Sequence, residues 1–290
     1  MTKAYPGGRG IFDLSIEIPA GEVFGLLGPN GAGKSTTIRH LMGFLRPDRG
    51  GARIHDLDCW AQAFKVQELV GYVPGEIGFP DEMTASEFLA LLSGLRGLGD
   101  STRRRDLCDR FDLDPRPTLR KMSKGTKQKV ALVAAFMHQP AVLVLDEPTS
   151  GLDPLMQRRF LELVEEERRR GTTVLMSSHA FAEVERVSDR VGIVREGRLV
   201  AVEDVVSLRR MEKKVMSVTT GREQDVATVA AAGFRVVGRR HLTVDVEVQG
   251  DYNAFVQTLA RCDVRAIDVH PQSLEQIFMH FYGEEEAAVP

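Results

Sequence analysis

The residues best suited to do chemistry form the octapeptide GPNGAGKS, Gly28 to Ser35, which fits the pattern G-x-x-x-x-G-K-[S/T]. It lies between an apolar run typical of a buried strand and the start of a helical pattern. Glycines allow successive backbone N–H groups to wrap a phosphate chain at the positive end of a helix. Lys34 adds a charge for the β- and γ-phosphates, and the Ser35 hydroxyl is placed to ligate Mg²⁺. The alternative, an ordinary glycine-rich turn, is disfavoured by the flanking elements.

A pair of carboxylates, Asp146 and Glu147, forms the second candidate group, at the end of the apolar run VLVL. Neighbouring residues on a strand point to opposite sides, so one carboxylate can face a metal and the other an incoming water. The alternative is a solvated strand-end pair that caps a helix. The four apolar residues before the pair, and Pro148 after it, favour a buried strand that delivers carboxylates to the phosphate site.

The elements that must position these residues alternate between apolar strand-like runs and helical patterns, which predicts an α/β fold with a mostly parallel sheet. Residues 84–139 read almost entirely as helix, which indicates a helical subdomain inserted at about 76–139. Strands are expected at 22–28, 141–148 and 172–179, with a hairpin turning at 196–197, and helices at 34–45, 153–171 and 180–187.

After about residue 203 the pattern changes to β-α-β-β-α-β-α and ends in SLEQIFMHFYG. That order is typical of the split-βαβ, ferredoxin-like fold. We therefore expect two domains, residues 1–205 and residues 206–290, of which the second is a small α+β domain.

The composition narrows the classes of partner. The 290 residues carry a net charge of −3, which gives no electrostatic reason to expect a nucleic-acid partner. The arginine runs at 103–105 and 168–170 lie among acidic residues and are interpreted as ion-paired helix faces. Three widely spaced cysteines indicate reduced structural thiols in the cytosol. The apolar runs are far shorter than the roughly 20 residues of a membrane-spanning helix.

Three further motifs identify a family. SKGTKQK (123–129) precedes the carboxylates, SGLDP (150–154) follows them, and SSH (177–179) ends the next strand. In that order, residues 1–205 resemble the nucleotide-binding subunit of ABC transporters, which implies a P-loop NTPase (RecA-like) core with a helical ABC subdomain. Residues 206–290 resemble the accessory domain of ABC-2-type exporter ATPases, which include drug and antibiotic efflux systems, and a regulatory role is expected for them.

The resemblance implies a role for each matched residue. Glu147 would be the general base or orient the attacking water, Asp146 would hold Mg²⁺ indirectly, and His179 would contact the γ-phosphate. Asp153 would communicate between two sites, although it could also be a helix N-cap. The ATP contacts would come from an aromatic residue that stacks on adenine and from the phosphate loop: Tyr5, Gly28, Pro29, Asn30, Gly31, Ala32, Gly33, Lys34, Ser35 and Thr36.

The family also implies partners. Two ATPase subunits, expected to be a homodimer, would close head to tail on two Mg-ATP, so that the signature residues of one subunit meet the γ-phosphate on the other. A separate membrane permease would be driven by this closure, with the ATPase on the cytoplasmic face. A drug, antibiotic or other small amphipathic molecule is the expected cargo. The signature residues would be Ser123, Lys124, Gly125 and Thr126.

Two other functions were weighed. One is a soluble ABC ATPase acting in translation or DNA repair, but such proteins typically carry two ATPase domains or a long coiled coil. The other is a regulatory module that binds nucleotide without turnover, which the presence of Glu147 and His179 disfavours.

Three departures from the family pattern stand out. Lys124 replaces the first of two adjacent glycines in the signature, and Thr126 occupies its later position. Only four residues precede Tyr5, so either an edge strand is missing or the natural start lies upstream. Gly75 stands where a glutamine normally reaches Mg²⁺ and water. Glu76 is the nearest polar candidate to replace it, and its carboxylate could approach Mg²⁺ or stay in solvent.

Overall fold

A computed structural model describes residues 1–99, 102–211, 214–248 and 252–271. The chain divides into two compact units, Met1–Val205 and Val206–Pro290, which are described separately. The last helix expected from the sequence, within SLEQIFMHFYG, lies outside the described residues. In the ranges that the structure describes, no helix combines the length and apolarity needed to traverse a bilayer.

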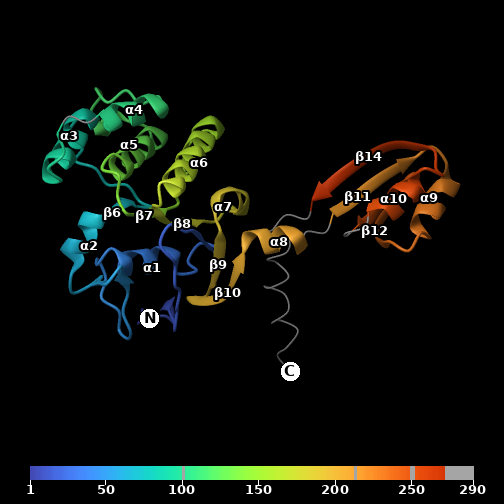
Figure 1. The fold of residues 1–290 in the computed structure, drawn as a ribbon, viewed down its shortest axis with the longest axis horizontal. Coiled ribbons are helices and arrows are strands. Elements are labelled where there is room, and N and C mark those ends of the chain that lie inside the picture. Colours follow the sequence, from blue (N-terminus) through green and yellow to red (C-terminus); the bar gives the residue numbers. More distant parts are fainter. Residues whose placement is uncertain (100–101, 212–213, 249–251, 272–290) are drawn as a thin grey trace. The chain divides into compact units, whose positions relative to one another are not determined.

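The first unit is built on a six-stranded sheet with the order β10-β9-β3-β8-β7-β6 (Figure 1). All neighbours are parallel except the β9–β10 hairpin, which confirms the expected α/β fold with a mostly parallel sheet. The strands are β3 (Val23–Leu27), β6 (Val70–Val73), β7 (Val142–Asp146), β8 (Thr173–Ser178), β9 (Arg190–Arg195) and β10 (Arg198–Asp204).

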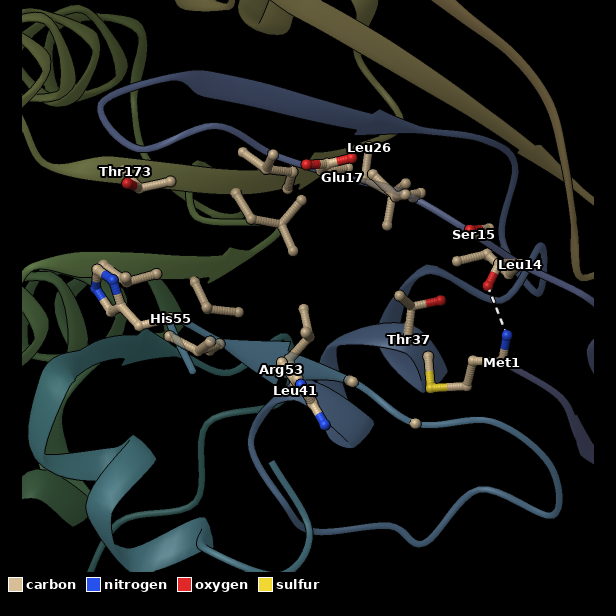
Figure 2. Close-up of a pocket in the computed structure, with 18 of the residues that line it drawn as sticks. Met1, Leu14, Ser15, Glu17, Leu26, Thr37, Leu41, Arg53, His55 and Thr173 are labelled. Atoms are coloured by element: carbon tan, nitrogen blue, oxygen red, sulfur yellow. Dashed lines mark hydrogen bonds between the residues drawn. The ribbon is translucent and has the colours of Figure 1, made fainter. Parts of the chain in front are cut away.

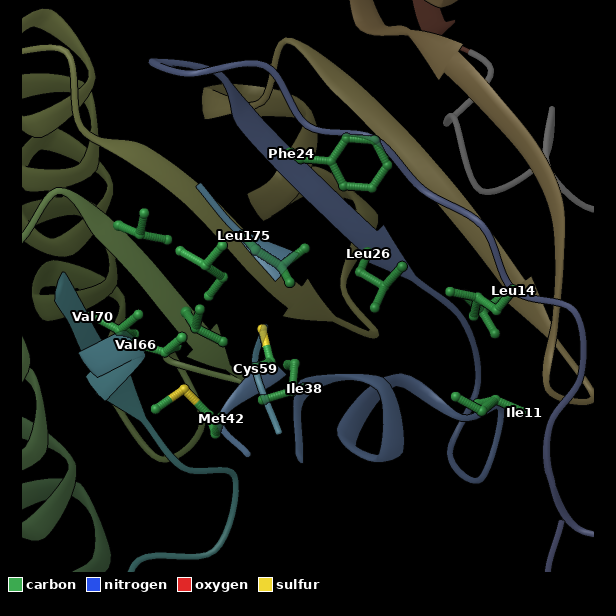
Figure 3. Close-up of a cluster of buried hydrophobic side chains, with 14 of the residues drawn as sticks. Ile11, Leu14, Phe24, Leu26, Ile38, Met42, Cys59, Val66, Val70 and Leu175 are labelled. Carbon is green, nitrogen blue, oxygen red and sulfur yellow. The ribbon is translucent and has the colours of Figure 1, made fainter. Parts of the chain in front are cut away.

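Helices cover both faces of this sheet, which explains why β3 and β7 are apolar and buried at almost every position. Phe24 and Leu26 of β3 pack in one core with Ile38, on the face of α1 (Lys34–Leu41). Gly25 between them faces Val184 of α7 (Phe181–Val187), whose methyl group occupies the space of a Cβ. Figure 3 shows the core on the α1 side, which extends to Leu175 of the adjacent strand β8 and to Val70 of the edge strand β6.

A helical insertion between β6 and β7 confirms the expected helical subdomain. Its helices are α3 (Ala85–Leu95), α4 (Thr102–Arg110), the 3-10 turn Leu119–Lys121 and α5 (Lys124–Phe136). Helix α3 begins with a capping box, in which the Thr84 hydroxyl accepts from the Glu87 N–H and the Glu87 carboxylate accepts from the Thr84 N–H. After β7 follows α6 (Pro154–Arg169), close to its expected bounds.

Other boundaries differ from the sequence prediction. Helix α1 ends at Leu41 and not near residue 45, because Gly43 adopts a left-handed φ of 69° directly after the Met42 C-cap. Several short elements were not predicted: α2 (Ala63–Leu69), α8 (Val205–Met211), and the strands β4 (Arg53–Ile54) and β5 (Leu57–Asp58). A two-residue strand β1 (Lys3–Ala4) does precede Tyr5, paired with β2 (Gly10–Ile11).

A cavity of about 520 Å³ lies on the α1 side of the sheet, between the segment from Leu14 to Ala20 and β4 (Figure 2). Its described lining is mostly apolar and includes Leu26 and Leu175 of the sheet. The amino group of Met1 donates to the Leu14 carbonyl at one end of it (2.8 Å). No phosphate-loop residue is among its described lining residues, so this cavity is separate from the predicted nucleotide site.

The second unit has the expected β-α-β-β-α-β order over the residues that the structure describes. Its sheet has the order β12-β13-β11-β14 with every pair antiparallel, as in a ferredoxin-like fold. A separate core of valines, with Phe255 and Leu259, lies under its helices. The elements are β11 (Lys214–Thr220), α9 (Glu223–Ala230), β12 (Arg235–Arg240), β13 (Thr243–Val248), α10 (Tyr252–Leu259) and β14 (Val264–Pro271).

Candidate active site

The predicted phosphate loop joins β3 to α1, as the motif requires. Two of its glycines are needed for close approach. A Cβ on Gly28 would lie 2.3 Å from the Val194 carbonyl oxygen, and a Cβ on Gly33 would lie 2.8 Å from Ile11. No side chain caps the first turn of α1, so its N–H groups remain available to an anion. Of the other predicted ATP contacts in this stretch, Ala32 is buried, Thr36 is half-buried, and Pro29, Asn30, Gly31 and Ser35 are exposed.

Lys34 lies under this loop with only 5% of its side chain exposed. Its ammonium group donates to the carbonyl oxygens of Gly28 (2.7 Å) and Pro29 (3.2 Å). Burial lowers the pKa of Lys34, while the charges of Glu147 and Asp146 raise it. Because the ammonium group is shielded from water, its attraction to a phosphate is stronger than at an exposed site.

The two carboxylates share one organising hydroxyl. Ser177 lies beside Asp146 in the β7–β8 register, and its Oγ donates to Asp146 Oδ1 (2.6 Å). The same Oγ accepts from the N–H of Glu147 (3.1 Å), and Glu147 adopts a left-handed φ of 48° directly after the strand. Asp146 is buried, whereas Glu147 is 27% exposed. Sequence reasoning assigned no role to Ser177, because a serine in an apolar strand carries no local signal.

His179 and Lys34 both approach Glu147. The Nδ1 atom of His179 lies 3.3 Å from Glu147 Oε2, and the Lys34 ammonium lies 3.9 Å from Glu147 Oε1. The structure therefore brings together the three residues that sequence analysis named as catalytic, from three separate strand ends.

The signature residues open helix α5. Ser123 is its N-cap, and its Oγ accepts from the Thr126 N–H (3.2 Å) and lies 2.9 Å from the Thr126 hydroxyl. Lys124, the residue that departs from the family pattern, donates to the Ser150 hydroxyl (3.0 Å). A Cβ on Gly125 would lie 2.4 Å from the Gly151 carbonyl oxygen. The first turn of α5 therefore packs directly against the turn that follows the two carboxylates.

A buried amide links the same two segments further along α5. Gln128 is 2% exposed, and its Nε2 donates to the Pro148 carbonyl oxygen (2.8 Å). Sequence reasoning did not single out this residue. Its only available signal was a polar residue on the apolar face of a helix.

Asp153 is the N-cap of α6, where its Oδ1 accepts from the N–H groups of Leu155 and Met156 (both 3.0 Å). The helix-cap role weighed from sequence is thus present. The communication role stays a prediction.

Gly75 follows β6 and lies against the carboxylate of Asp146. A Cβ at this position would lie 3.0 Å from Asp146 Oδ2, so the residue is adjacent to the predicted Mg²⁺ site although it has no side chain. Glu76 is exposed. Its role stays a prediction.

Tyr5 lies in the loop between β1 and β2, with its N–H donating to the Arg9 carbonyl oxygen (2.8 Å) and its side chain 37% exposed. A cavity of about 460 Å³ connects this loop to the phosphate loop. Tyr5 is not among its described lining residues. Two of the residues that line this cavity, Phe12 and Arg198, were not predicted from the sequence. The guanidinium carbon of Arg198 lies 5.6 Å from the centre of the Phe12 ring. The lining residues are Gly8, Arg9, Gly10, Phe12, Gly31, Glu196 and Arg198.

The residues present fit a magnesium ion bound together with a nucleotide. Mg²⁺ keeps several waters and takes one or two protein oxygens plus phosphates, so no dedicated cage is needed. The exposed Ser35 hydroxyl and the Asp146 carboxylate are such oxygen groups. In the described part of the chain there is no cluster of three or more His, Cys, Asp or Glu side chains that could hold a metal alone.

Comparison with known proteins agrees with this geometry. Residues 11–150 match the family described as "ABC transporter". The linearmycin resistance ATP-binding protein LnrL of Bacillus subtilis is 30% identical over 98% of this chain and 96% of its own length. The daunorubicin/doxorubicin resistance ATP-binding protein DrrA of Streptomyces peucetius is 30% identical over 98% of this chain and 91% of its own. The bacitracin transport ATP-binding protein BcrA of Bacillus licheniformis is 28% identical, over 98% and 95%.

Solved structures show the same fold. An ATP-binding subunit of an ABC transporter superposes with a TM-score of 0.66 at 32% identity, over 72% of this chain and 89% of that one. A dimeric ATP-binding cassette, MJ0796, bound to ADP and Pi, superposes with a TM-score of 0.63 at 22% identity, over 70% of this chain and 96% of that one.

Proposed function

Because the chain belongs to the ATP-binding subunits of the ABC transporter family and is therefore an ATPase, we propose that two copies close around two Mg-ATP to drive a separate membrane permease. The observation that carries the catalytic part is the convergence of Lys34, Glu147 and His179, with contacts of 3.9 and 3.3 Å. Phosphoryl transfer requires mainly positioning and electrostatic stabilisation, which these groups supply.

Each of the three residues has a distinct task in this proposal. The partly exposed carboxylate of Glu147 accepts a proton from the attacking water or orients it. The shielded ammonium of Lys34 exchanges its contacts with the loop carbonyls for the β- and γ-phosphate oxygens. His179 contacts the γ-phosphate from the other side of Glu147. Ser35 and Asp146 would hold Mg²⁺, which neutralises charge on the phosphates when bound.

The signature residues act on the nucleotide of the partner subunit in this proposal. Helix α5 begins with Ser123 and Lys124, both exposed, and a helix N-terminus with a hydroxyl at its cap is a suitable site for a phosphate. Residues 150–151 support this turn from behind. The proposed homodimer would place it opposite the phosphate loop of the second copy.

The names of the relatives support a proposal for the cargo. Three similar proteins are named for linearmycin resistance, daunorubicin/doxorubicin resistance and bacitracin transport. We therefore propose export of a drug, an antibiotic or another small amphipathic molecule, with the substrate chosen by the permease. The ATPase would work on the cytoplasmic face of the membrane. For the second unit we propose a role in dimer contact or regulation, which unchanged dimerisation and ATP response after deletion of residues 206–290 would contradict.

A surface for the permease is suggested by exposed apolar side chains on the first unit. Phe44 lies beside α2, because its neighbour Gly43 packs against Ala63. The end of α3 lies beside the end of α2, because Arg96 donates to the Val70 carbonyl oxygen. Large apolar side chains on this surface would bury area against a permease loop. The proposed docking surface would consist of Phe44, Trp60, Phe64, Leu91 and Leu95, all between 47% and 77% exposed.

Steady-state ATPase activity, measured with and without a candidate permease, tests the proposal. Glu147→Gln removes the base and should lower kcat by about 10²-fold or more while ATP still binds. Glu162→Gln, at a surface glutamate of α6 whose carboxylate lies 3.6 Å from Arg158, is the matched control in the same unit and should leave turnover unchanged. Normal turnover in Glu147→Gln would refute the assignment of the base. Stimulation by ribosomes or DNA, with no response to any permease, would favour the soluble ABC ATPase instead.

A further inference from the structure

A polar contact outside the proposed catalytic trio connects the two turns that carry Glu147 and His179. We propose that Glu183, in the first turn of α7, is a positioning residue for ATP hydrolysis: its carboxylate sets the relative placement of these two turns. The inference rests on the catalytic roles proposed above for Glu147 and His179. Nothing in the family motifs pointed to Glu183 in the sequence.

The first contact joins Glu183 to the turn after the carboxylate pair. The Thr149 hydroxyl donates to Glu183 Oε2 at 2.6 Å, and Thr149 is 6% exposed. Thr149 lies two residues after Glu147, in a turn closed by a hydrogen bond from the Ser150 N–H to the Glu147 carbonyl oxygen (3.1 Å). A shift of Thr149 would therefore shift the backbone of Glu147.

The second contact joins the same carboxylate oxygen to the turn that carries His179. The Ser178 hydroxyl lies 3.5 Å from Glu183 Oε2 and 3.3 Å from the Ala180 carbonyl oxygen. It also accepts from the Ala180 N–H at 2.9 Å, so it closes the turn around His179. One carboxylate oxygen thus faces a hydroxyl from each turn.

Glu183 can act as a reference point because its helix is anchored in the core. Its neighbour Val184 is fully buried and fills the space above Gly25 of β3, and Val187 is also buried. The carboxylate is therefore fixed relative to the strand that leads into the phosphate loop. The hydrogen bond from Thr149 to this carboxylate therefore keeps the turn after Glu147 in a constant position relative to Lys34 and His179.

A purely structural role for Glu183 is the alternative. A carboxylate in the first turn of a helix interacts favourably with the helix dipole, which would stabilise the fold without affecting the reaction. The two roles differ in what they change. A positioning role changes kcat at constant KM for ATP, since a misplacement of about 1 Å in an active site can cost about 10²-fold in rate.

The decisive variants are Thr149→Val, which removes the hydroxyl and keeps the shape, and Thr149→Ser, which restores the hydroxyl. We expect kcat to fall about tenfold in Thr149→Val with the KM for ATP unchanged, and to recover to within about twofold in Thr149→Ser. Glu183→Gln should lower kcat as well. The double variant Thr149→Val/Glu183→Gln should have nearly the same kcat as Thr149→Val alone, because both substitutions remove the same interaction.

Thr172→Val is the matched control. Thr172 is also buried, and its hydroxyl donates to Glu167 Oε2 (3.3 Å) at the far end of α6. It should affect stability and leave kcat unchanged. A wild-type kcat in Thr149→Val, or an equal loss in Thr172→Val, would overturn the inference. Glu147→Gln is measured in parallel. If it abolishes turnover while Thr149→Val does not, only the role of Glu183 fails, and if it leaves turnover intact, the proposed base itself is wrong.

Discussion

Replacement of Gly125 by alanine tests the contact between the signature helix and the turn after the carboxylates. A Cβ at this position would lie 2.4 Å from the Gly151 carbonyl oxygen. This oxygen belongs to a turn fixed by hydrogen bonds from Ser150 to Glu147 (3.1 Å) and from Leu152 to Thr149 (3.0 Å). Neither side can yield by rotating a side chain. The backbones must separate by about 1 Å to restore an ordinary contact.

The expected cost follows from two opposed terms. Overpacking of a well-packed contact typically costs about 1–3 kcal/mol. Alanine in place of glycine within a helix stabilises the folded state by about 0.5–1 kcal/mol. Because the clash at 2.4 Å is with a backbone atom, the upper part of the overpacking range, about 2–3 kcal/mol, applies, and Gly125→Ala should lower the free energy of unfolding by about 1–2 kcal/mol. Gly94, inside α3, would meet no atom within 4 Å, so Gly94→Ala should instead raise it by about 0.5–1 kcal/mol.

Urea unfolding followed by tryptophan fluorescence measures this difference. Trp60 is the sole tryptophan of the chain and lies in the first unit, so its signal reports that unit in the full-length protein. With a slope of about 3 kcal/mol per M, the midpoint of Gly125→Ala should fall by roughly 0.5 M, while that of Gly94→Ala should rise. A midpoint for Gly125→Ala equal to or above that of the wild type would refute the close approach.

Three further predictions concern single residues. Asp153→Ala removes the α6 cap and should cost about 1 kcal/mol of stability, whereas Asp153→Asn should cost little, with urea midpoints as the measure. Burial, and to a smaller extent the charge of Arg96, lowers the pKa of His138 from 6.5 to about 4. Between these two pH values the imidazole binds a proton in the unfolded chain and not in the folded protein. Stability should fall as the pH drops from 6.5 to 4, and His138→Gln should weaken that dependence; identical pH profiles would contradict this. Glu76→Ala should lower ATPase activity and raise the Mg²⁺ concentration needed for half-maximal turnover if this carboxylate replaces the missing glutamine, and unchanged values would leave Gly75 as a bare turn.

The strands that carry the site could be predicted because each is a continuous apolar run followed by a polar motif. The glycine positions of the phosphate loop and the carboxylates at the end of β7 follow from such local patterns. Short elements such as β4 and α2 could not be predicted from the sequence, because elements of two to seven residues contain too little hydrophobic periodicity. The end of α1 was misplaced because apolar residues continue past Gly43, whose backbone stops the helix.

The supporting contacts of the site could not be predicted for a different reason. Ser177, Gln128 and Glu183 act through hydroxyl, amide and carboxylate groups on segments 20–34 residues away along the chain. Their partners are set by strand order and helix packing, and these residue types are common on surfaces. The sequence likewise shows that Gly75 lacks a side chain, but only the fold shows that Asp146 lies where a side chain at this position would begin.

The order of the strands has a consequence during synthesis of the protein. Strand β3, which leads into the phosphate loop, lies between β8 and β9 in the sheet, and these two strands begin at Thr173 and Arg190. At about 5–20 residues per second, a ribosome needs roughly 7–30 s to make the intervening chain. Throughout that interval the apolar segment VFGLL has neither of its neighbours. The phosphate loop and β3 are therefore synthesised early, but the sheet around them forms only when β8 and β9 have been made. Until then the nascent chain exposes an apolar strand to which chaperones can bind.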